Sequence, residues 1–378
     1  MSDTTLLKPI HVLCPLGNPR SPRMWSGTTF HLTRVLESRG RLGVAEQVQV
    51  AKAWDFADRV GRWLLKEQDR RPGTSTVMHH ARTWATQRRV RDLAEGHIIH
   101  IGTREFPWRN GQPKKRNHFL IDSTWRSWMA AQIGKLVSPN MAKALDERER
   151  QCLAQVDHIF CMGQYVKAGI ERDYGIDADR VTAVGSGFGG ITPYFGPKNY
   201  RNKKLLFVAK SNFVKKGGAL VVEAVRRARQ SDPDITLTLV GQESYPPQYT
   251  EWPWLQRLGR LPPGGDILQK LYDEHSMFLM PSQYDAWGIA YLEALACRMP
   301  IVGLDCNAFP EISGNGKYGF ILHTQEPDEF ARVLLDALSR PDDLARMGSE
   351  GQSFCLSHYT WDRMVDRMLA VIDAKGDR

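Results

Sequence analysis

The sequence lacks the long apolar runs that mark proteins built into a membrane. None of its 378 residues belongs to an uninterrupted apolar stretch of about 18 or more, the length that a membrane-spanning helix needs. The opening residues, MSDTTLLKPIHVLCPLG, also lack the basic segment and apolar core of a signal peptide. We therefore expect a globular protein that stays in the cytosol.

Cysteines are few, and none of the six stands in C-x-x-C spacing: Cys14, Cys152, Cys161, Cys297, Cys306 and Cys355. Scattered cysteines favour reduced thiols in the core over a disulfide framework or a zinc site. The histidines His79, His80, His97 and His100 have no cysteine or acidic partner at ligand spacing. We therefore expect no disulfide and no metal site.

Internal repeats of solenoid length and low-complexity segments are absent as well. The chain is longer than one ordinary core, so its length predicts about two domains. In both halves short apolar runs alternate with helical periodicity, which is typical of parallel sheets covered on both faces. The expected fold class is α/β, with two doubly wound, Rossmann-like domains facing a cleft.

The expected elements follow from this alternation. In the second half we expect strands at 205–209, 235–241, 277–282, 301–305 and 319–322, and helices at 218–231, 266–275, 289–299 and 329–340. In the first half we expect strands at 10–17, 97–103, 118–124, 158–163 and 181–186, a helix at 30–40, and a helical pattern from about 55 to 95.

A segment dense in glycine and proline, residues 186–204, separates the halves and is interpreted as a hinge. We place an N-terminal domain at 1–190 and a C-terminal domain at 200–350. The remaining segment, 351–378, carries an apolar stripe that predicts a last helix packed against the rest of the protein.

Positive charge is concentrated in the first half. Residues 1–200 hold 30 Lys and Arg against 19 Asp and Glu, whereas residues 201–378 hold 21 against 23. Much of the excess lies between Arg59 and Arg91 and in the run Lys114-Lys115-Arg116. Such a surface suits phosphates, anionic lipid headgroups or nucleic acid, and an ordinary solvated face is an equal alternative.

The stretch DAWGIAYLE (285–293) places two carboxylates around the start of a helix. Asp285 follows an expected strand, at the edge where open α/β sheets bind ligands. The helix is expected to begin at Gly288 or Ile289, where unpaired N–H groups and the helix dipole favour a diphosphate. Glu293 lies about one turn further on, where a carboxylate can accept hydrogen bonds from a vicinal diol. The alternative is a capping Asp and a surface Glu.

Two further loops follow strands and open helices. In FVAKSNFVKKGG (207–218), Lys210 and either Lys215 or Lys216 are candidates to bind the same phosphates, with a lysine-rich surface turn as the alternative. In RMWSGTTFH (23–31), the small residues around Gly27 allow close approach to a ligand, although such turns are common in any fold.

The second half resembles the retaining nucleotide-sugar glycosyltransferases of the GT-B fold, specifically glycosyltransferase family 4. The resemblance covers about 205 to 322 and is carried, in order, by LLFVAK, KKGG, ITLTLVGQE, DILQKLYDEHSMFLMPS, DAWGIAYLEALACRMPIVG, FPEI and YGFIL. HYTWDRM (358–364) is similar to the start of the family's last helix, which crosses back to the first domain. WSGTTFH, FCMGQYVKAGIERDYGI and VTAVGSG match less specifically.

The resemblance implies a role for each candidate residue. Asp285 and Glu293 fall on the family's E-x7-E motif, in which the first acid contacts the donor sugar and the second contacts the ribose; here the first is an Asp. Lys210 and Lys216, or Lys215 because the spacing is one residue longer, fall on the diphosphate-binding pair. Gly27, Gly288 and Ile289 lie at the diphosphate, and Arg260 and Leu261 at the nucleoside.

Two positions depart from the family's pattern. Where the family often has a His near the reacting sugar, HFLIDSTW offers Asp122 and Ser123, and we expect Asp122 to act there. In FPEI, Glu311 matches the family, whereas Asn307 and Ala308 replace its usual glycine pair.

The implied function is a retaining, metal-independent hexosyltransferase that moves a sugar from a UDP or GDP sugar to an acceptor hydroxyl, without a cofactor. The N-terminal domain would bind a glycan or lipid-linked acceptor for bacterial-type polysaccharide or glycolipid biosynthesis, in contact with an anionic membrane at its inner face. Three alternatives stay open: a GT-B phosphorylase, a non-catalytic sugar-nucleotide-binding relative, and a basic nucleic-acid-binding protein, for which we find no binding module.

Overall fold

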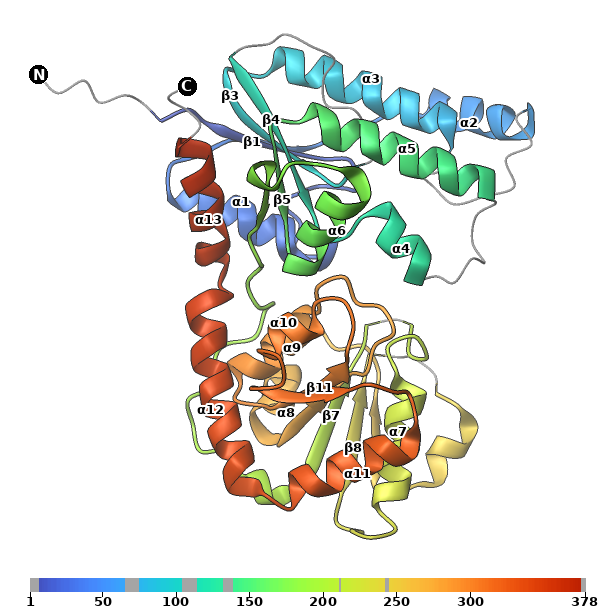
Figure 1. The fold of residues 1–378 in the computed structure, drawn as a ribbon, viewed down its shortest axis with the longest axis vertical. Coiled ribbons are helices and arrows are strands. Elements are labelled where there is room, and N and C mark those ends of the chain that lie inside the picture. Colours follow the sequence, from blue (N-terminus) through green and yellow to red (C-terminus); the bar gives the residue numbers. More distant parts are fainter. Residues whose placement is uncertain are drawn as a thin grey trace, which may run out of the picture. The chain divides into compact units, whose positions relative to one another are not determined.

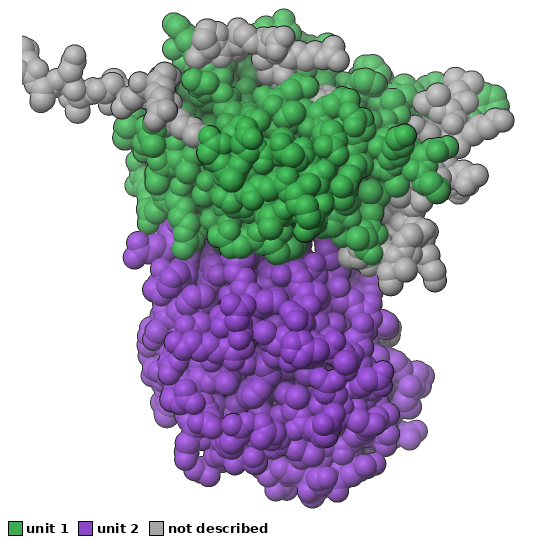
Figure 2. All heavy atoms as spheres, in the orientation of Figure 1, with its two compact units in different colours: residues 1–185, 364–378 green, residues 186–363 purple. Residues whose placement is uncertain are grey.

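The computed structural model describes residues 7–64, 75–103, 114–131, 139–210, 212–241 and 245–374. The chain divides into two compact units (Figures 1 and 2). Unit 1 consists of Met1–Gly185 and Met364–Arg378, and unit 2 of Ser186–Arg363. Each unit is built around its own parallel sheet.

The sheet of unit 1 has the strand order β2-β1-β3-β4-β5-β6, and every pairing is parallel. Its strands are β1 (Ile10–Cys14), β2 (Leu42–Gln47), β3 (Gly96–Ile101), β4 (Lys115–Ile121), β5 (His158–Cys161) and β6 (Val181–Ala183). Its helices are α1 (Thr28–Ser38), α2 (Ala53–Leu64), α3 (Thr76–Asp92), α4 (Trp125–Ala131), α5 (Pro139–Gln155) and α6 (Gln164–Tyr174), with 3-10 turns η1 (Met24–Gly27) and η2 (Ala178–Arg180).

The sheet of unit 2 has the order β12-β11-β10-β7-β8-β9, again parallel throughout. Its strands are β7 (Lys204–Val208), β8 (Thr236–Val240), β9 (Leu255–Leu258), β10 (Met277–Leu279), β11 (Ile301–Leu304) and β12 (Gly319–Leu322). Its helices are α7 (Gly218–Ala228), α8 (Asp266–Glu274), α9 (Ile289–Ala296), α10 (Phe309–Ile312), α11 (Pro327–Leu338) and α12 (Pro341–His358), with 3-10 turns η3 (Tyr200–Asn202) and η4 (Pro247–Glu251).

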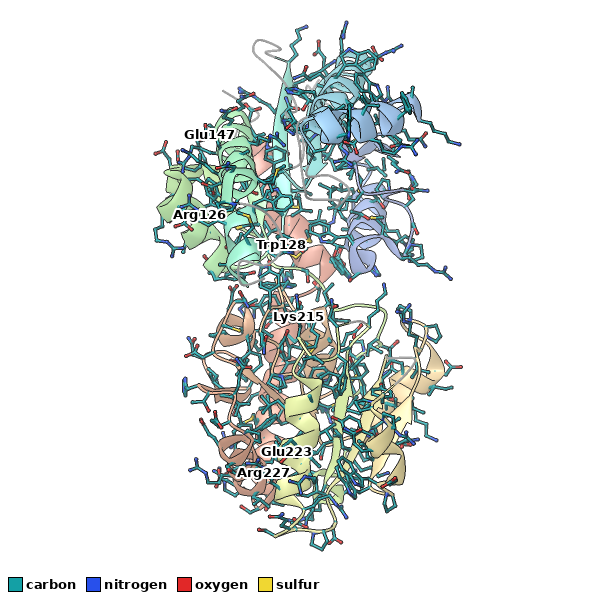
Figure 3. All side chains as sticks on the ribbon, turned by 90° about the vertical axis from the view of Figure 1, so that its right-hand side faces the viewer. Arg126, Trp128, Glu147, Lys215, Glu223 and Arg227 are labelled. Atoms are coloured by element: carbon teal, nitrogen blue, oxygen red, sulfur yellow. The ribbon has the colours of Figure 1, made fainter. Side chains whose placement is uncertain are left out.

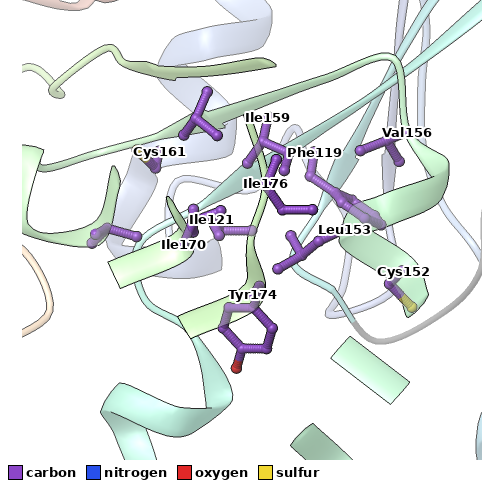
Figure 4. Packing of buried hydrophobic residues seen from close by; sticks show 12 residues of the cluster. Phe119, Ile121, Cys152, Leu153, Val156, Ile159, Cys161, Ile170, Tyr174 and Ile176 are labelled. Carbon is purple, nitrogen blue, oxygen red and sulfur yellow. The ribbon is translucent and has the colours of Figure 1, made fainter. Parts of the chain in front are cut away.

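Helices cover both faces of each sheet, which explains why the central strands read as continuous apolar runs rather than alternating ones. β1, β3 and β5 are buried at every position. Figure 4 shows one of the resulting cores, where α5 and α6 pack on β4 and β5 through side chains that include Phe119, Leu153, Ile159 and Ile170. The expected fold class, with its two doubly wound domains, is confirmed.

The last helix, α13 (Trp361–Ala374), belongs to unit 1 from Met364 onward. Arg41 binds Asp373 through a two-pronged ion pair, with nitrogen–oxygen distances of 2.8 and 3.1 Å, and Arg39 binds Asp366. The terminal segment 351–378, which was predicted to form one helix, contains parts of two in its described residues. α12 continues to His358, and α13 starts at Trp361.

The segment predicted as a hinge, residues 186–204, lies in unit 2, and its glycines allow close packing. A Cβ at Gly187 would lie 2.6 Å from the ring of Trp361. The structure also contains β2 and β9, which the periodicity did not predict, and their edge positions explain their weaker apolar patterns. Of the helical pattern from 55 to 95, residues 65–74 lie outside the described residues.

None of the six cysteines, all of which lie in the described ranges, forms a disulfide, and all but Cys306 are buried. Among the helices that the structure describes, none has the length and apolar character needed to span a bilayer.

Candidate functional site

The helix α9 begins after a residue whose backbone conformation and close packing require glycine. Gly288 precedes it with φ of 83°, in the left-handed region, and a Cβ there would lie 2.5 Å from the ring of Tyr291. The first N–H groups of the helix, starting at Ile289, have no acceptor within the helix and carry the positive end of its dipole. The helix therefore begins where the sequence predicts, with the features of an anion-binding end.

Two predicted residues from different loops meet in front of this helix. Lys216 Nζ lies 2.6 Å from Asp285 Oδ2, and each side chain is only about one-fifth exposed, at 22% and 23%. Their loops are locked together by backbone contacts: the Gln283 N–H donates to the Lys215 carbonyl over 3.0 Å. Gly217, with φ of 81°, packs so closely that a Cβ would lie 2.3 Å from the Pro281 carbonyl oxygen.

The other two candidate lysines lie on the surface of the same region. Lys210 lies two residues after the end of β7 and is exposed, and Lys215 is exposed as well. Figure 3 places Lys215 beyond the first turn of α7, at the opposite end of that helix from Glu223 and Arg227. Of the two alternatives in the KKGG loop, Lys216 is the one that the fold brings to Asp285.

Glu293 is held by partners that the sequence did not reveal. The buried Tyr272 hydroxyl donates to its Oε2 over 3.0 Å, and the Gly190 N–H donates a second hydrogen bond. Desolvation raises the pKa of Glu293 to about 7, and the two hydrogen bonds lower it. Gly189 permits this close approach, because a Cβ there would lie 2.1 Å from Glu293 Oε1.

The predicted nucleoside-binding residues Arg260 and Leu261 lie on the loop after β9, with Arg260 exposed and Leu261 half-buried. This loop reaches the Glu293 region through Gly264, whose Cβ, if present, would lie 2.6 Å from the Gly190 carbonyl oxygen. The carboxylate of Glu293 and this loop therefore share one backbone support. Glu311 lies in the first turn of α10.

In unit 1 the structure joins the loop of Gly27 to Asp122. The indole N–H of Trp25 donates to Asp122 Oδ2 over 2.9 Å, and the Ser123 hydroxyl donates to Oδ1 over 3.3 Å. Trp25, Ser26 and Gly27 have φ of 44°, 55° and 86°, so three successive residues adopt left-handed conformations. For residues other than glycine this conformation costs about 1–3 kcal/mol each and persists only where the surrounding structure maintains it. In this loop the strained conformation places the indole N–H of Trp25 at Asp122.

Sequence reasoning missed Tyr272, the glycines of GFGG (187–190) and Trp25. Tyr272 gave no signal, because an aromatic residue at helical spacing is the usual pattern of a core helix. GFGG did give a signal, but we interpreted its glycines as flexibility. In the structure they provide space for Trp361 and Glu293.

No group of three or more His, Cys, Asp or Glu in the described ranges is arranged to hold a metal. Of the four histidines considered as metal ligands, His79, His97 and His100 are buried in unit 1, whereas His80 is exposed. His97 Nδ1 lies 3.0 Å from His118 Nε2, and His100 Nε2 lies 2.9 Å from the Asn117 amide oxygen. Burial lowers the pKa of His97 and of His100 to about 4, so both are neutral at pH 7.

Residues 194–354 match the family Glycosyl transferases group 1. Over 275 residues the chain is 23% identical to an alpha-maltose-1-phosphate synthase of Mycolicibacterium smegmatis, covering 65% of this chain and 69% of that protein. Alignments with three further curated relatives cover 26%, 53% and 56% of those proteins. The matched segment contains every candidate residue of unit 2.

Two solved structures share the fold over nearly the whole chain. A sucrose-phosphate synthase from Thermosynechococcus elongatus superposes with a TM-score of 0.72 at 13% identity, covering 98% of this chain and 99% of that one. HepE from Anabaena, in complex with UDP, gives a TM-score of 0.66 at 14% identity, covering 97% and 100%. These structures confirm the GT-B architecture, and the matched domain and the curated relatives support the expectation of a glycosyltransferase enzyme.

Proposed function

We propose that the group 1 glycosyltransferase domain of this chain binds a nucleoside diphosphate sugar and that the enzyme transfers the sugar, with retention and without a metal, to an acceptor hydroxyl. The observation that carries this proposal is the arrangement around α9. Its N-terminal N–H groups, the Lys216–Asp285 pair and the supported carboxylate of Glu293, one turn into the helix, all belong to unit 2. We place the enzyme in glycosyltransferase family 4.

Each part has a distinct task in this proposal. The α9 N-terminus and Lys216, with Lys210 or Lys215, stabilise the diphosphate as negative charge develops on it. Asp285 contacts the donor sugar, and Lys216 limits its movement through their ion pair. Glu293 accepts hydrogen bonds from the ribose hydroxyls, beside Arg260 and Leu261, while Asp122 orients a hydroxyl of the transferred sugar or of the acceptor.

The proposed reaction needs no enzyme nucleophile. The bond between the anomeric carbon and the diphosphate oxygen breaks, and the acceptor oxygen bonds to the same face of that carbon. The acceptor proton passes to the departing diphosphate, so the products are a glycoside and a nucleoside diphosphate. Exclusion of water protects the donor from hydrolysis.

Donor and acceptor are proposed only as classes. The UDP in the HepE structure supports a uridine donor, with GDP sugars as the alternative. For the acceptor we propose a glycan or a lipid-linked sugar in polysaccharide or glycolipid biosynthesis, reached at the inner face of a membrane, because residues 1–200 carry the whole positive excess of the chain.

Calorimetric titration of UDP, GDP and ADP in EDTA tests the donor site. We expect one nucleotide to bind, and Lys216→Ala to weaken that binding roughly tenfold, since a charged hydrogen bond contributes about 1.5–3 kcal/mol. Lys317→Ala is the matched control, because Lys317 is an exposed lysine of unit 2 that pairs with Glu350 instead. Absence of binding by all three nucleotides would exclude the proposed donor site.

A further inference from the structure

Helix α2 of unit 1 is amphipathic in the reverse of the usual sense. Phe56, Val60 and Trp63, spaced four and three residues apart, fall within about 60° of one another around the helix. They are 66%, 39% and 78% exposed. In a globular protein such a stripe normally faces the core.

The opposite face of α2 explains this orientation. Asp58, 7% exposed, accepts a hydrogen bond from Ser75, the residue that caps the N-terminus of α3. Gly61 is packed so closely that a Cβ would lie 2.5 Å from Val77. The polar and small side of α2 is thus fixed against α3, which lies alongside it in Figure 1, and the apolar stripe must point outward.

Arginines border this apolar surface. The Arg59 guanidinium lies 5.9 Å from the ring centre of Phe56, and that of Arg88 lies 5.6 Å from the ring centre of Trp84, which is itself 56% exposed on α3. α2 and α3 contain six arginines and three aspartates, of which Asp58 is buried. The exposed charged residues that the structure describes on α2 and α3, counted together with the residue before α2, are mainly basic. Four are basic (Lys52, Arg59, Arg88 and Arg91) and two are acidic (Asp55 and Asp92).

We propose that Phe56, Val60 and Trp63 on α2, with the neighbouring arginines, dock the enzyme on an anionic lipid bilayer surface. Aromatic side chains that lie at headgroup depth beside arginine are the composition of interfacial helices. A stable protein interface instead needs roughly 800 Å² per partner and a centre depleted of charge. A stripe one side chain wide and bordered by arginine fits a bilayer better than a protein partner.

This inference deepens the proposed function, because a lipid-linked acceptor would be presented at the surface on which α2 docks. Only the link to a lipid-linked acceptor rests on the proposed function. The docking surface itself is defined by the exposure and packing of α2, whatever reaction the enzyme catalyses.

Flotation of the full chain with phosphatidylcholine vesicles, with and without phosphatidylserine, tests the docking. We expect binding to the anionic vesicles that falls roughly tenfold in each of Phe56→Ser and Trp63→Ser. It should fall roughly fivefold in each of Arg59→Gln and Arg88→Gln, and decrease in high salt. Ile267→Ser is the matched control, since Ile267 is an equally exposed apolar residue on a helix of unit 2 at 61%.

Three outcomes would overturn the docking: no binding of the wild type to either vesicle, equal binding to neutral and anionic vesicles, or unchanged binding by the α2 variants. A concentration-dependent dimer that the same variants abolish, without lipid binding, would assign the stripe to a second copy of the chain. Nucleotide binding, measured by calorimetry on the same preparations, verifies that each variant is folded. Nucleotide binding without flotation would reject only the docking, and flotation without nucleotide binding would reject only the proposed donor site.

Discussion

Among the described residues, each unit contains one glutamate whose pKa is raised to about 7, and the two glutamates differ in how much of their hydrogen-bonding capacity the protein itself uses. Glu149 on α5 of unit 1 is 1% exposed, and burial is the main cause of its raised pKa. It accepts hydrogen bonds from the Thr103 hydroxyl (2.6 Å), the Trp125 N–H (2.7 Å) and the Tyr174 hydroxyl (2.5 Å). Glu293 of unit 2 is half-buried and accepts two hydrogen bonds, from Tyr272 and Gly190.

The surroundings of Glu149 give it a structural task. Its bond to Trp125 holds the first turn of α4, and Arg126 of that turn also binds Asp146 of α5 over 2.6 and 3.1 Å. Figure 3 shows Arg126 and Trp128 on α4, and Glu147, which follows Asp146, on α5. Since a carboxylate has about four acceptor positions, Glu149 is nearly saturated by protein donors inside a closed core.

Glu293 keeps acceptor capacity at a partly exposed position, beside a helix end that favours anions. A raised pKa therefore does not by itself distinguish a functional carboxylate from a structural one. The distinction lies in whether protein donors already occupy the oxygens and whether a ligand can reach them.

The largest expected effect comes from exchanging each glutamate for glutamine. We expect Glu293→Gln to lower kcat/KM about 10³-fold, because the neutral amide cannot make the two charge-assisted hydrogen bonds that the carboxylate accepts from the ribose. Glu149→Gln should lower it less than about threefold, since the amide can retain all three partners. Steady-state sugar transfer with circular dichroism as a folding check measures both. Equal losses in the two variants would remove the distinction.

The second effect concerns stability against pH. Because its pKa in the folded protein lies above the unfolded value, Glu149 binds more protons in the folded state between about pH 4.5 and 7. Its contribution is therefore fully present below pH 4.5 and is lost as the pH rises through 7. The loss is about 3 kcal/mol at 1.36 kcal/mol per pKa unit. Hydrogen exchange of the β4 and β5 amides across this range measures it, and Glu149→Gln should flatten the curve.

A curve of the same slope in Glu149→Gln would show that another group causes the pH dependence. His97 and His100 titrate near pH 4 and contribute with the opposite sign, since their folded pKa is depressed and they gain stability as the pH rises towards 6.5. The prediction for Glu149 is therefore tested most cleanly by the difference between wild type and variant at each pH.

The smallest effect extends the comparison to Asp122, a carboxylate oriented by Trp25. Trp25→Phe removes the indole N–H and should lower kcat about tenfold while leaving nucleotide affinity unchanged, because it removes a bond to Asp122 and keeps Gly27, the expected diphosphate contact of the same loop. Ser123→Ala, which removes the longer bond of 3.3 Å, should have a smaller effect. Unchanged kcat in Trp25→Phe would show that the orientation of Asp122 is not needed.

The central strands and the helices between them could be predicted because both follow from local periodicity. β2 and β9 could not, since edge strands with one solvated side lack a continuous apolar run. Asp285, Lys216 and Glu293 could be named because strand ends and helix starts are readable in the sequence. Tyr272 and Gly189, which support Glu293, and Trp25, which binds Asp122, could not be named, because they are distant in the chain from these carboxylates or have side chains typical of any core.

The sequence alone determined the two α/β domains, the start of α9 at Gly288, and the concentration of positive charge in the first half. The tertiary structure decided which lysine meets Asp285, which tyrosine holds Glu293, and that the glycines of GFGG provide space rather than flexibility. It also decided that the apolar stripe of α2 faces outward. Periodicity defines which residues share a face of a helix, but only packing against other elements determines where that face points.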